Sequence, residues 1–425
     1  QDQTVELTGT LEVIVVDDFE NNKADYLYYL NDNGKRYELK LKDQFTTASP
    51  NTQVNIKGTF SGDKIVVDTL ETVKQTSKIA LNFQEIDPRL DNLGPQKTLV
   101  AIFRTNNVSY NFDNATMQDI YNRIFTDDPN MTFGWGTVNL YYRINSYNKT
   151  YFVGNVVGEY NVTINDSNCS ADLEQYFKEL AKYHNLSEYS RFILGGPRTR
   201  CDGNSGAWAT QGKIELQTPQ GVIHASVIRL ITSFGGNTIA HEMGHNFGAK
   251  HANAYWCYSG SEIIFDITNP YSYDCESYEY GDFYDIMGGW NEQLQMNALH
   301  KEELGWLEKN NTLITTNGTY LIKPLEYPTN SGLIQEIKLP LILEPNMYIL
   351  DNNTFLSLSY RENSDFYAGR IFKTKLIDII IGISSETGFT NKPTTQVITN
   401  LKGFTNGSYI NKELGYNITI INFTS

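Results

Sequence analysis

The sequence lacks any long hydrophobic segment. Its apolar runs stay well short of the roughly 18–20 residues that a membrane-spanning helix needs. The longest run, residues 376–383, is short and rich in β-branched side chains, so it predicts a buried strand. We therefore expect no transmembrane segment.

Basic residues are too scarce for a nucleic-acid-binding protein. The chain has 34 Lys and Arg against 49 Asp and Glu, which gives a formal net charge of −15. Contacts to phosphate need clustered Lys and Arg, and the sequence offers no such cluster. We expect no nucleic-acid partner, and we interpret the dispersed acidic residues as solvated surface.

Cysteine is rare, and its even number points to an oxidising compartment. The four cysteines all lie between residues 169 and 275. Three pairings are conceivable for such a set. We favour Cys169 with Cys201 and Cys257 with Cys275, because each bond would close a short local loop; free thiols remain the alternative.

Glycosylation acceptors are dense from residue 107 onward, and they favour a secreted, extracellular or cell-surface glycoprotein. The N-terminus shows neither a charged nor an apolar signal region, so we expect any signal peptide to have been removed from this numbering. The Asn-x-Ser/Thr sequences lie at Asn107, Asn114, Asn130, Asn148, Asn161, Asn165, Asn168, Asn185, Asn310, Asn317, Asn352, Asn406, Asn417 and Asn422.

The residue pattern divides the 425 residues into three segments, more than one hydrophobic core usually serves. Residues 1–78 alternate apolar and polar side chains and predict a small β-barrel, for which an OB-like topology fits. Residues 79–308 mix strand and helix patterns, and predict an α/β domain. Residues 309–425 hold short β-rich runs between turn residues, which predict a β-sandwich. The expected fold class is multidomain α+β.

The most informative segment is His241-Glu242-Met243-Gly244-His245-Asn246-Phe247-Gly248-Ala249-Lys250-His251, which holds three of the six histidines. Residues four apart on a helix share one face, so His241 and His245 converge on one point. Gly248 adopts a left-handed conformation at little cost, so it can end the helix and return His251 to the same point. The sequence predicts a metal site with three imidazole ligands.

Three neutral imidazoles leave a fourth position for water, as in a catalytic zinc site. Nitrogen ligands suit Zn²⁺ better than Mg²⁺ or Ca²⁺. Glu242 follows the first ligand directly and can take a proton from the bound water, whose pKa zinc lowers, and pass it to the leaving amine. The alternatives are a structural zinc clip or three hydrogen-bonded core histidines, neither of which needs Glu242.

This motif is that of the metzincin metallopeptidases, and a second landmark supports the resemblance. Residues 284–290, Tyr-Asp-Ile-Met-Gly-Gly-Trp, resemble the methionine turn that lies beneath the zinc, with Met287 as the methionine. The zinc motif with Ala252 after it, and residues 296–307, look most like the gametolysin-type peptidases. The resemblance implies that residues 79–308 are a metzincin-like catalytic domain, closed by a helix at 296–307. By its spacing alone that helix is an ordinary amphipathic segment, and we expect His300 on its surface.

The resemblance also implies an extended substrate along an edge strand, for which residues 206–209 are the candidate; an ordinary loop there is equally compatible with the sequence. Calcium is common in such enzymes, but the acidic pairs at 17–18 and 127–128 match no calcium loop, and we interpret them as solvated surface. Gly289 occupies the place of a tyrosine ligand found in some metzincins. No cysteine precedes Cys169 in this sequence, so we expect no cysteine switch within it; any latency would use a removed segment or another group.

Taken together, these patterns predict a secreted zinc-dependent endopeptidase. The gametolysin-like resemblance implies matrix or cell-wall glycoproteins as its substrates. The alternative from another class is a glycosylated surface or matrix component, in which the peptidase-like domain serves in assembly with extracellular partners.

Overall fold

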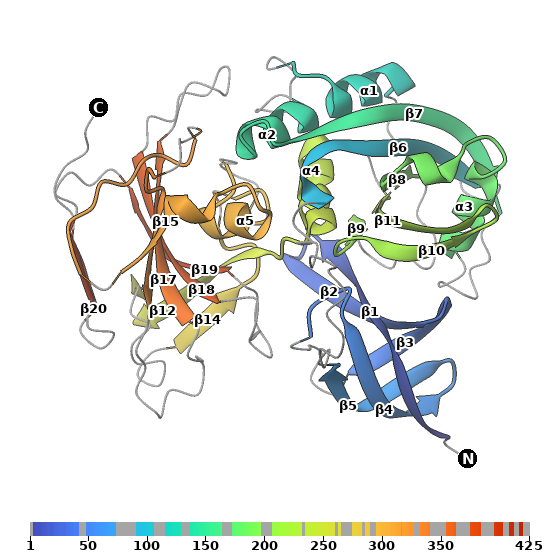
Figure 1. Cartoon of the computed structure of the whole chain (residues 1–425), viewed down its shortest axis with the longest axis horizontal. Helices are drawn as coiled ribbons and strands as arrows, with labels where there is room; N and C mark the ends of the chain where they lie inside the picture. The colour runs from blue at the N-terminus through green and yellow to red at the C-terminus, as the bar shows by residue number, and fades with distance from the viewer. Residues whose placement is uncertain are drawn as a thin grey trace, which may run out of the picture. The chain divides into compact units, whose positions relative to one another are not determined.

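The computed structural model forms two compact units, one made of residues 1–142 and 150–249 and the other of 143–149 and 250–425 (Figure 1). The structure describes residues 3–41, 48–73, 91–105, 115–128, 137–163, 172–196, 206–231, 234–259, 262–264, 274–282, 285–289, 295–315, 317–326, 328, 332–340, 354–362, 375–383, 395–402, 408–411 and 416–419. The fold is mixed α+β and rich in sheet.

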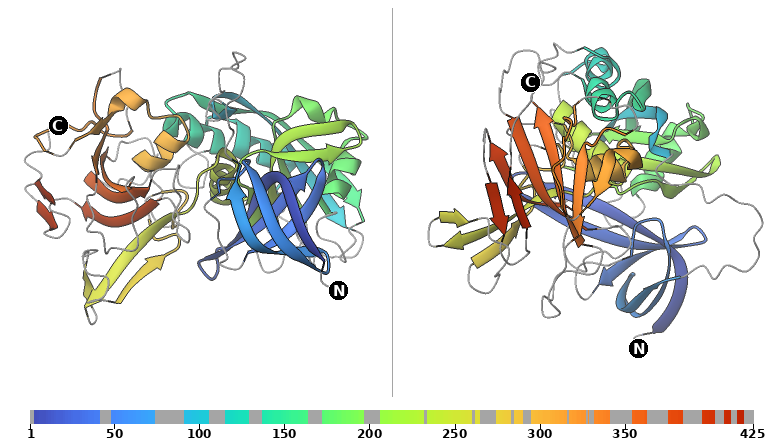
Figure 2. Two further views of the ribbon diagram at one scale, coloured as in Figure 1. Left: turned by 60° about the horizontal axis from the view of Figure 1, so that its bottom comes forward. Right: turned by 60° about the vertical axis from the view of Figure 1, so that its left-hand side comes forward.

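The first five strands of unit 1 pair in a closed ring. In the order of pairing, β1 contacts β2, then β3, β5 and β4, and β4 returns to β1. Figure 2 shows these strands in blue as a strongly curled sheet. Their bounds are β1 Thr4–Asp18, β2 Lys23–Asp32, β3 Lys35–Leu41, β4 Gln53–Ser61 and β5 Lys64–Thr72.

The ring is filled from one side of each strand. Leu11 and Val13 of β1 are buried with Leu30, Val54 and Ile56 in one apolar cluster. Residues two apart on a strand face the same side, so the alternation in the sequence explains this packing.

The same sheet continues from β1 into a second group of strands, in the order β1-β9-β11-β8-β6-β7. Four of these strands, β11, β8, β6 and β7, are parallel neighbours, whereas β9 runs antiparallel to β11 and to β1. The bounds are β6 Gly94–Thr105, β7 Thr150–Val162, β8 Arg191–Gly195, β9 Ala207–Thr210, β10 Ile214–Thr218, which pairs with β11, and β11 Gly221–Leu230.

Three of the helices are α1 Met117–Phe125, α2 Val138–Asn145 and α3 Asp172–Leu180. The N-cap of α1 is Thr116, whose hydroxyl accepts from the N–H of Asp119. The fourth helix, α4 Gly236–Phe247, carries the histidine motif.

Unit 2 is built on a second sheet, in the order β13-β12-β19-β18-β17-β16-β15, with β14 beside β12 and a separate β20–β21 hairpin. Its helix is α5 Ala298–Glu303. The strand expected at 376–383 is confirmed as β18. The bounds are β12 Ala252–Ser259, β13 Glu262–Ile264, β14 Asp274–Tyr278, β15 Thr312–Ile314, β16 Glu336–Pro340, β17 Thr354–Glu362, β18 Lys375–Ile383, β19 Thr395–Lys402, β20 Ser408–Asn411 and β21 Tyr416–Thr419.

Asp285 ties the turn around Met287 to the start of α5. Its carboxylate accepts from the N–H of Met287 at 2.8 Å and from the N–H of Asn297, the cap of α5, at 2.7 Å. It also contacts the Nδ1 of His300 at 3.0 Å. His300 is fully buried, so its expected position on the surface was wrong; the helical pattern could not show that a carboxylate lies beside it.

Burial by itself would raise the pKa of Asp285 and lower the pKa of His300. The attraction between the two groups and their hydrogen bond outweigh burial, so the pKa of Asp285 is lowered and the pKa of His300 is raised. Both shifts favour the charged pair.

Replacing Asp285 with Ala removes the carboxylate that this network shares. We expect the free energy of unfolding to fall by about 3–5 kcal/mol, because the charge of the buried His300 would no longer be balanced by a carboxylate. Asp285 stabilises the fold above the unfolded carboxyl pKa and loses this effect as pH falls through its lowered folded pKa. His300 stabilises the fold below the unfolded imidazole pKa, and this stabilisation is lost as pH rises through its raised folded pKa. The difference between variant and parent is therefore largest between about pH 4 and 6.5.

Denaturant unfolding at several pH values measures this difference. Glu308→Ala is the matched control, because Glu308 is an exposed carboxylate paired with Lys149 and should contribute little. Equal unfolding midpoints for the two variants would contradict a structural role for Asp285.

No helix among the described residues is long and apolar enough to cross a membrane.

Candidate metal centre

The helix α4 brings two imidazoles together. His241 and His245 lie one turn apart, and their ring centroids are 5.0 Å from each other. The helix ends at Gly248, which has φ +106° and donates its N–H to the carbonyl of His245 at 2.8 Å. A left-handed residue at this position turns the chain sharply, and only glycine adopts it without strain. His251 follows three residues later.

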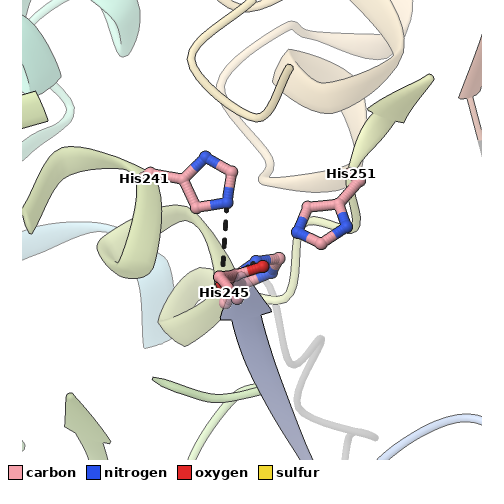
Figure 3. Close-up of side chains that lie close together, drawn as sticks. His241, His245 and His251 are labelled. Atoms are coloured by element: carbon pink, nitrogen blue, oxygen red, sulfur yellow. Dashed lines mark ion pairs between the residues drawn. The ribbon is translucent and has the colours of Figure 1, made fainter. Parts of the chain in front are cut away.

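The three imidazoles converge with a carboxylate that the sequence analysis did not assign to the site (Figure 3). One ligand atom each from Asp17, His241, His245 and His251 all lie within 4.8 Å of one another, and all four side chains are buried. The Oδ2 of Asp17 is 3.5 Å from the Nε2 of His245 and 3.8 Å from the Nε2 of His241. Asp17 is fully buried, so its interpretation as solvated surface was wrong.

This donor set fits zinc. Ligand atoms placed tetrahedrally at about 2.0–2.1 Å from a zinc ion lie about 3.3–3.4 Å apart, close to the two distances from Asp17. Imidazole nitrogens with one carboxylate oxygen are ordinary zinc ligands, and a cation would compensate the burial of the carboxylate.

Two of the imidazoles are oriented by hydrogen bonds at their other nitrogen. The Nδ1 of His245 lies 2.8 Å from the carbonyl oxygen of Ala249. The Nδ1 of His251 lies 2.8 Å from the Oε1 of Glu279. Such contacts fix the ring and leave Nε2 for a metal, and they are typical of histidine ligands.

Glu242 is fully buried next to the first ligand. Burial raises its pKa well above the usual carboxyl value, and the nearby carboxyl group of Asp17 raises it further. A bound dication would act in the opposite direction. Glu242 is thus a carboxyl group that can hold or release a proton close to the imidazoles.

Polar contacts fasten α4 to the sheet beneath it. The side-chain amide of Asn246 donates to the carbonyl of Thr210 in β9 at 2.9 Å and to the carbonyl of Val227 in β11 at 3.2 Å. The guanidinium of Arg191 donates to the carbonyl of Asn246 at 3.0 Å and lies 3.9 Å from the ring centre of Phe247. Burial lowers the pKa of Arg191 to about 9. Three strands, β8, β9 and β11, therefore hold the helix that carries His241 and His245.

Residues 206–209 overlap a strand, β9 Ala207–Thr210, as expected, but β9 is not an edge strand. One of its edges pairs with β11 and the other pairs with β1.

The remaining site predictions are placed as follows. Met287 is fully buried, and its carbonyl accepts from the N–H of Ala252 at 2.9 Å. Cys257 and Cys275 are direct partners in the pairing of β12 with β14. Cys169 and Cys201 lie outside the described residues.

The acceptor asparagines divide into three groups. Those with an exposed side chain are Asn148, Asn161, Asn185, Asn310 and Asn317. Asn417 belongs to β21. Those outside the described residues are Asn107, Asn114, Asn130, Asn165, Asn168, Asn352, Asn406 and Asn422.

The sequence analysis missed Asp17, Glu279 and Asp285. A signal for Asp17 was available, because Val13 and Val15 are on the buried face of β1 and Asp17 follows at the same spacing of two. Glu279 and Asp285 have no comparable local signal, since each depends on a contact made by folding.

A reprolysin model of metallo-peptidase family M12 matches residues 97–284, which include α4 and all three histidines of the motif. No curated protein matches the chain. The family match supports a metzincin-type zinc metalloendopeptidase, and hence a protein substrate.

Replacing His245 with Ala should remove one ligand and weaken zinc binding by at least about 10–100-fold, the range seen even when only an outer-shell partner is lost. Equilibrium dialysis with metal analysis measures the bound zinc. His224→Ala is the matched control, because His224 is an exposed imidazole on β11. Equal zinc affinity in the two variants would show that the metal is held elsewhere.

Proposed function

We propose that the chain is a secreted zinc-dependent endopeptidase. The observation that carries the proposal is the buried cluster of three imidazoles with Glu242 beside it, within the segment that matches the M12 family. His241, His245 and His251 would hold the zinc. When bound, zinc polarises a scissile carbonyl and lowers the pKa of a water molecule.

The protein's own groups would supply positioning and proton transfer. Glu242 would take a proton from the attacking water and deliver it to the leaving amine, a role that suits a buried carboxyl group at this position. An extended peptide substrate would pair with the backbone of β9 along the edge that now pairs with β1, and would therefore have to displace β1 from that edge.

The gametolysin-type resemblance of the zinc motif and of residues 296–307 supports matrix or cell-wall glycoproteins as the substrate class. We further propose that the strand ring β1–β5 is a small OB-like barrel and that residues 309–425 contain a β-sandwich. The ring's order of pairing, β1-β2-β3-β5-β4-β1, supports the first assignment.

Two features support extracellular localisation. The structure describes the side chains of five acceptor asparagines, and all five are exposed, as a glycan requires: Asn148, Asn161, Asn185, Asn310 and Asn317. Cys257 lies opposite Cys275 in backbone register, a placement compatible with a cross-strand disulfide.

The competing hypothesis is an assembly component of the extracellular matrix whose peptidase-like domain is structural. Cleavage of a denatured protein substrate separates the two. We expect cleavage to be lost on chelation and restored by zinc, whereas Glu242→Ala should bind zinc and cleave at least about 10²-fold more slowly, the usual contribution of a general base.

The assay should use the full chain with Asp17 intact and, in parallel, the full chain with Asp17→Ala, because Asp17 lies against the imidazoles. Each background is compared with and without Glu242→Ala. No Glu242-dependent cleavage in either background, with zinc demonstrably bound, would favour the assembly hypothesis.

Secretion is tested separately by expressing the chain in a eukaryotic secretory host. We expect an enzymatic deglycosylation to lower its apparent mass, and non-reducing peptide mapping to recover Cys257 and Cys275 in one disulfide-linked fragment. Asn148→Gln should abolish the glycan at that one position. An unmodified chain with alkylatable Cys257 and Cys275 would contradict the extracellular assignment.

A further inference from the structure

The edge of β9 that a substrate would need is covered by the chain's own first strand. Residues Ile14–Asp17 of β1 are antiparallel register partners of Ala207–Thr210. Two more backbone bonds extend this ladder: Gln211 donates to the carbonyl of Val13 at 2.9 Å, and Gly206 donates to the carbonyl of Asp17 at 3.1 Å. A peptide adding to this edge would meet backbone groups that are already paired.

The ladder ends where the metal cluster begins. Asp17 is the last residue of β1 to pair with β9, and its carboxylate reaches the Nε2 atoms of His241 and His245 at 3.8 and 3.5 Å. It is fully buried, next to the buried carboxyl group of Glu242. Two carboxyl groups are expensive to bury together without a cation, so this placement points to a metal ligand.

The turn after Asp17 adds an aromatic side chain to the same place. Phe19 packs edge-on against the imidazole of His241, with the ring centroids 5.3 Å apart. The turn is fixed by Asn21, which donates from its side chain to the carboxylate of Asp18 at 2.6 Å and from its backbone N–H to the carbonyl of Asp18 at 3.2 Å. The β1–β2 hairpin therefore ends on the metal cluster.

We propose that the N-terminal strand ring is an internal inhibitor of the peptidase site, in which β1 occupies the substrate edge of β9 and Asp17 takes the fourth ligand position of the zinc. This inference rests on the proposed function, because it concerns the regulation of that same site. Three imidazoles and one carboxylate complete a four-coordinate site, which leaves no position for water. Activity then requires that Asp17 and the β1–β9 ladder separate from the site.

The test uses the full chain with Co²⁺ in place of Zn²⁺, because the visible spectrum of Co²⁺ reports its ligands without any need for catalysis. Acetohydroxamate, a small chelating ligand, serves as the probe of a vacant coordination position. In the parent chain we expect Asp17 to exclude the probe. In Asp17→Asn we expect an altered cobalt spectrum and probe binding at least about tenfold tighter, since apparent affinity falls with the fraction of sites that are accessible.

Asp25→Asn is the matched control. Asp25 is an exposed carboxylate on β2, directly opposite Val16 of β1, so this variant changes the same charge without touching the cluster. It should give the spectrum and the probe affinity of the parent chain. Asp17→Ala is the second variant, and thermal unfolding of the metal-free proteins checks that each variant is folded.

The outcomes separate this inference from the proposed function. Identical cobalt spectra and probe affinities for the parent chain and the folded Asp17 variants would overturn the assignment of Asp17, whether or not the protein cleaves a substrate. Exclusion of the probe by the parent chain and its binding by Asp17→Asn would support the assignment even if neither protein cleaved. In that case the inhibitor would stand as a metal ligand, and the proposed peptidase function would fail.

Discussion

The burial of several ionisable groups in one small volume is the constraint on which the rest of the site depends. Two carboxyl groups, Asp17 and Glu242, lie fully buried beside three buried imidazoles. Without compensation such a cluster would oppose folding. A zinc dication balances two carboxylates, and it uses the ring nitrogens as ligands. The surrounding elements are therefore best understood as parts of one charge-compensated centre.

The portion of this centre that could be predicted from sequence is the portion encoded by local geometry. The spacing of His241 and His245 requires only a helix, and Gly248 requires only a turn that glycine makes easily. Asp17 enters through pairing of β1 with β9, which no local period specifies. Its spacing of two after Val13 and Val15 could have indicated that it lies inside, but not which groups it contacts there. The prediction that His300 lies on the surface was wrong for the same reason, because its partner Asp285 belongs to a separate turn of the chain.

The architecture of unit 1 explains how one strand can serve two structures. If the edge of β9 were unpaired it would invite association with other chains, and proteins commonly cover such edges. Here the cover is β1, whose earlier residues pair with β4 while its later residues pair with β9 and with β2. The strand that completes the N-terminal ring, β1, is thus also the strand that extends the sheet of β9, β11, β8, β6 and β7.

This sharing determines what release of the site must involve. Rotation of the Asp17 side chain alone would free a ligand position, but the backbone ladder from Val13 to Asp17 would still occupy the edge of β9. Conversely, β1 cannot leave β9 without moving a carboxylate that a bound metal would hold. The two contacts therefore reinforce each other, and breaking both together costs more than breaking either by itself. An inhibitor built in this way should open cooperatively, as a movement of the hairpin as a whole, rather than by gradual loosening of one side chain.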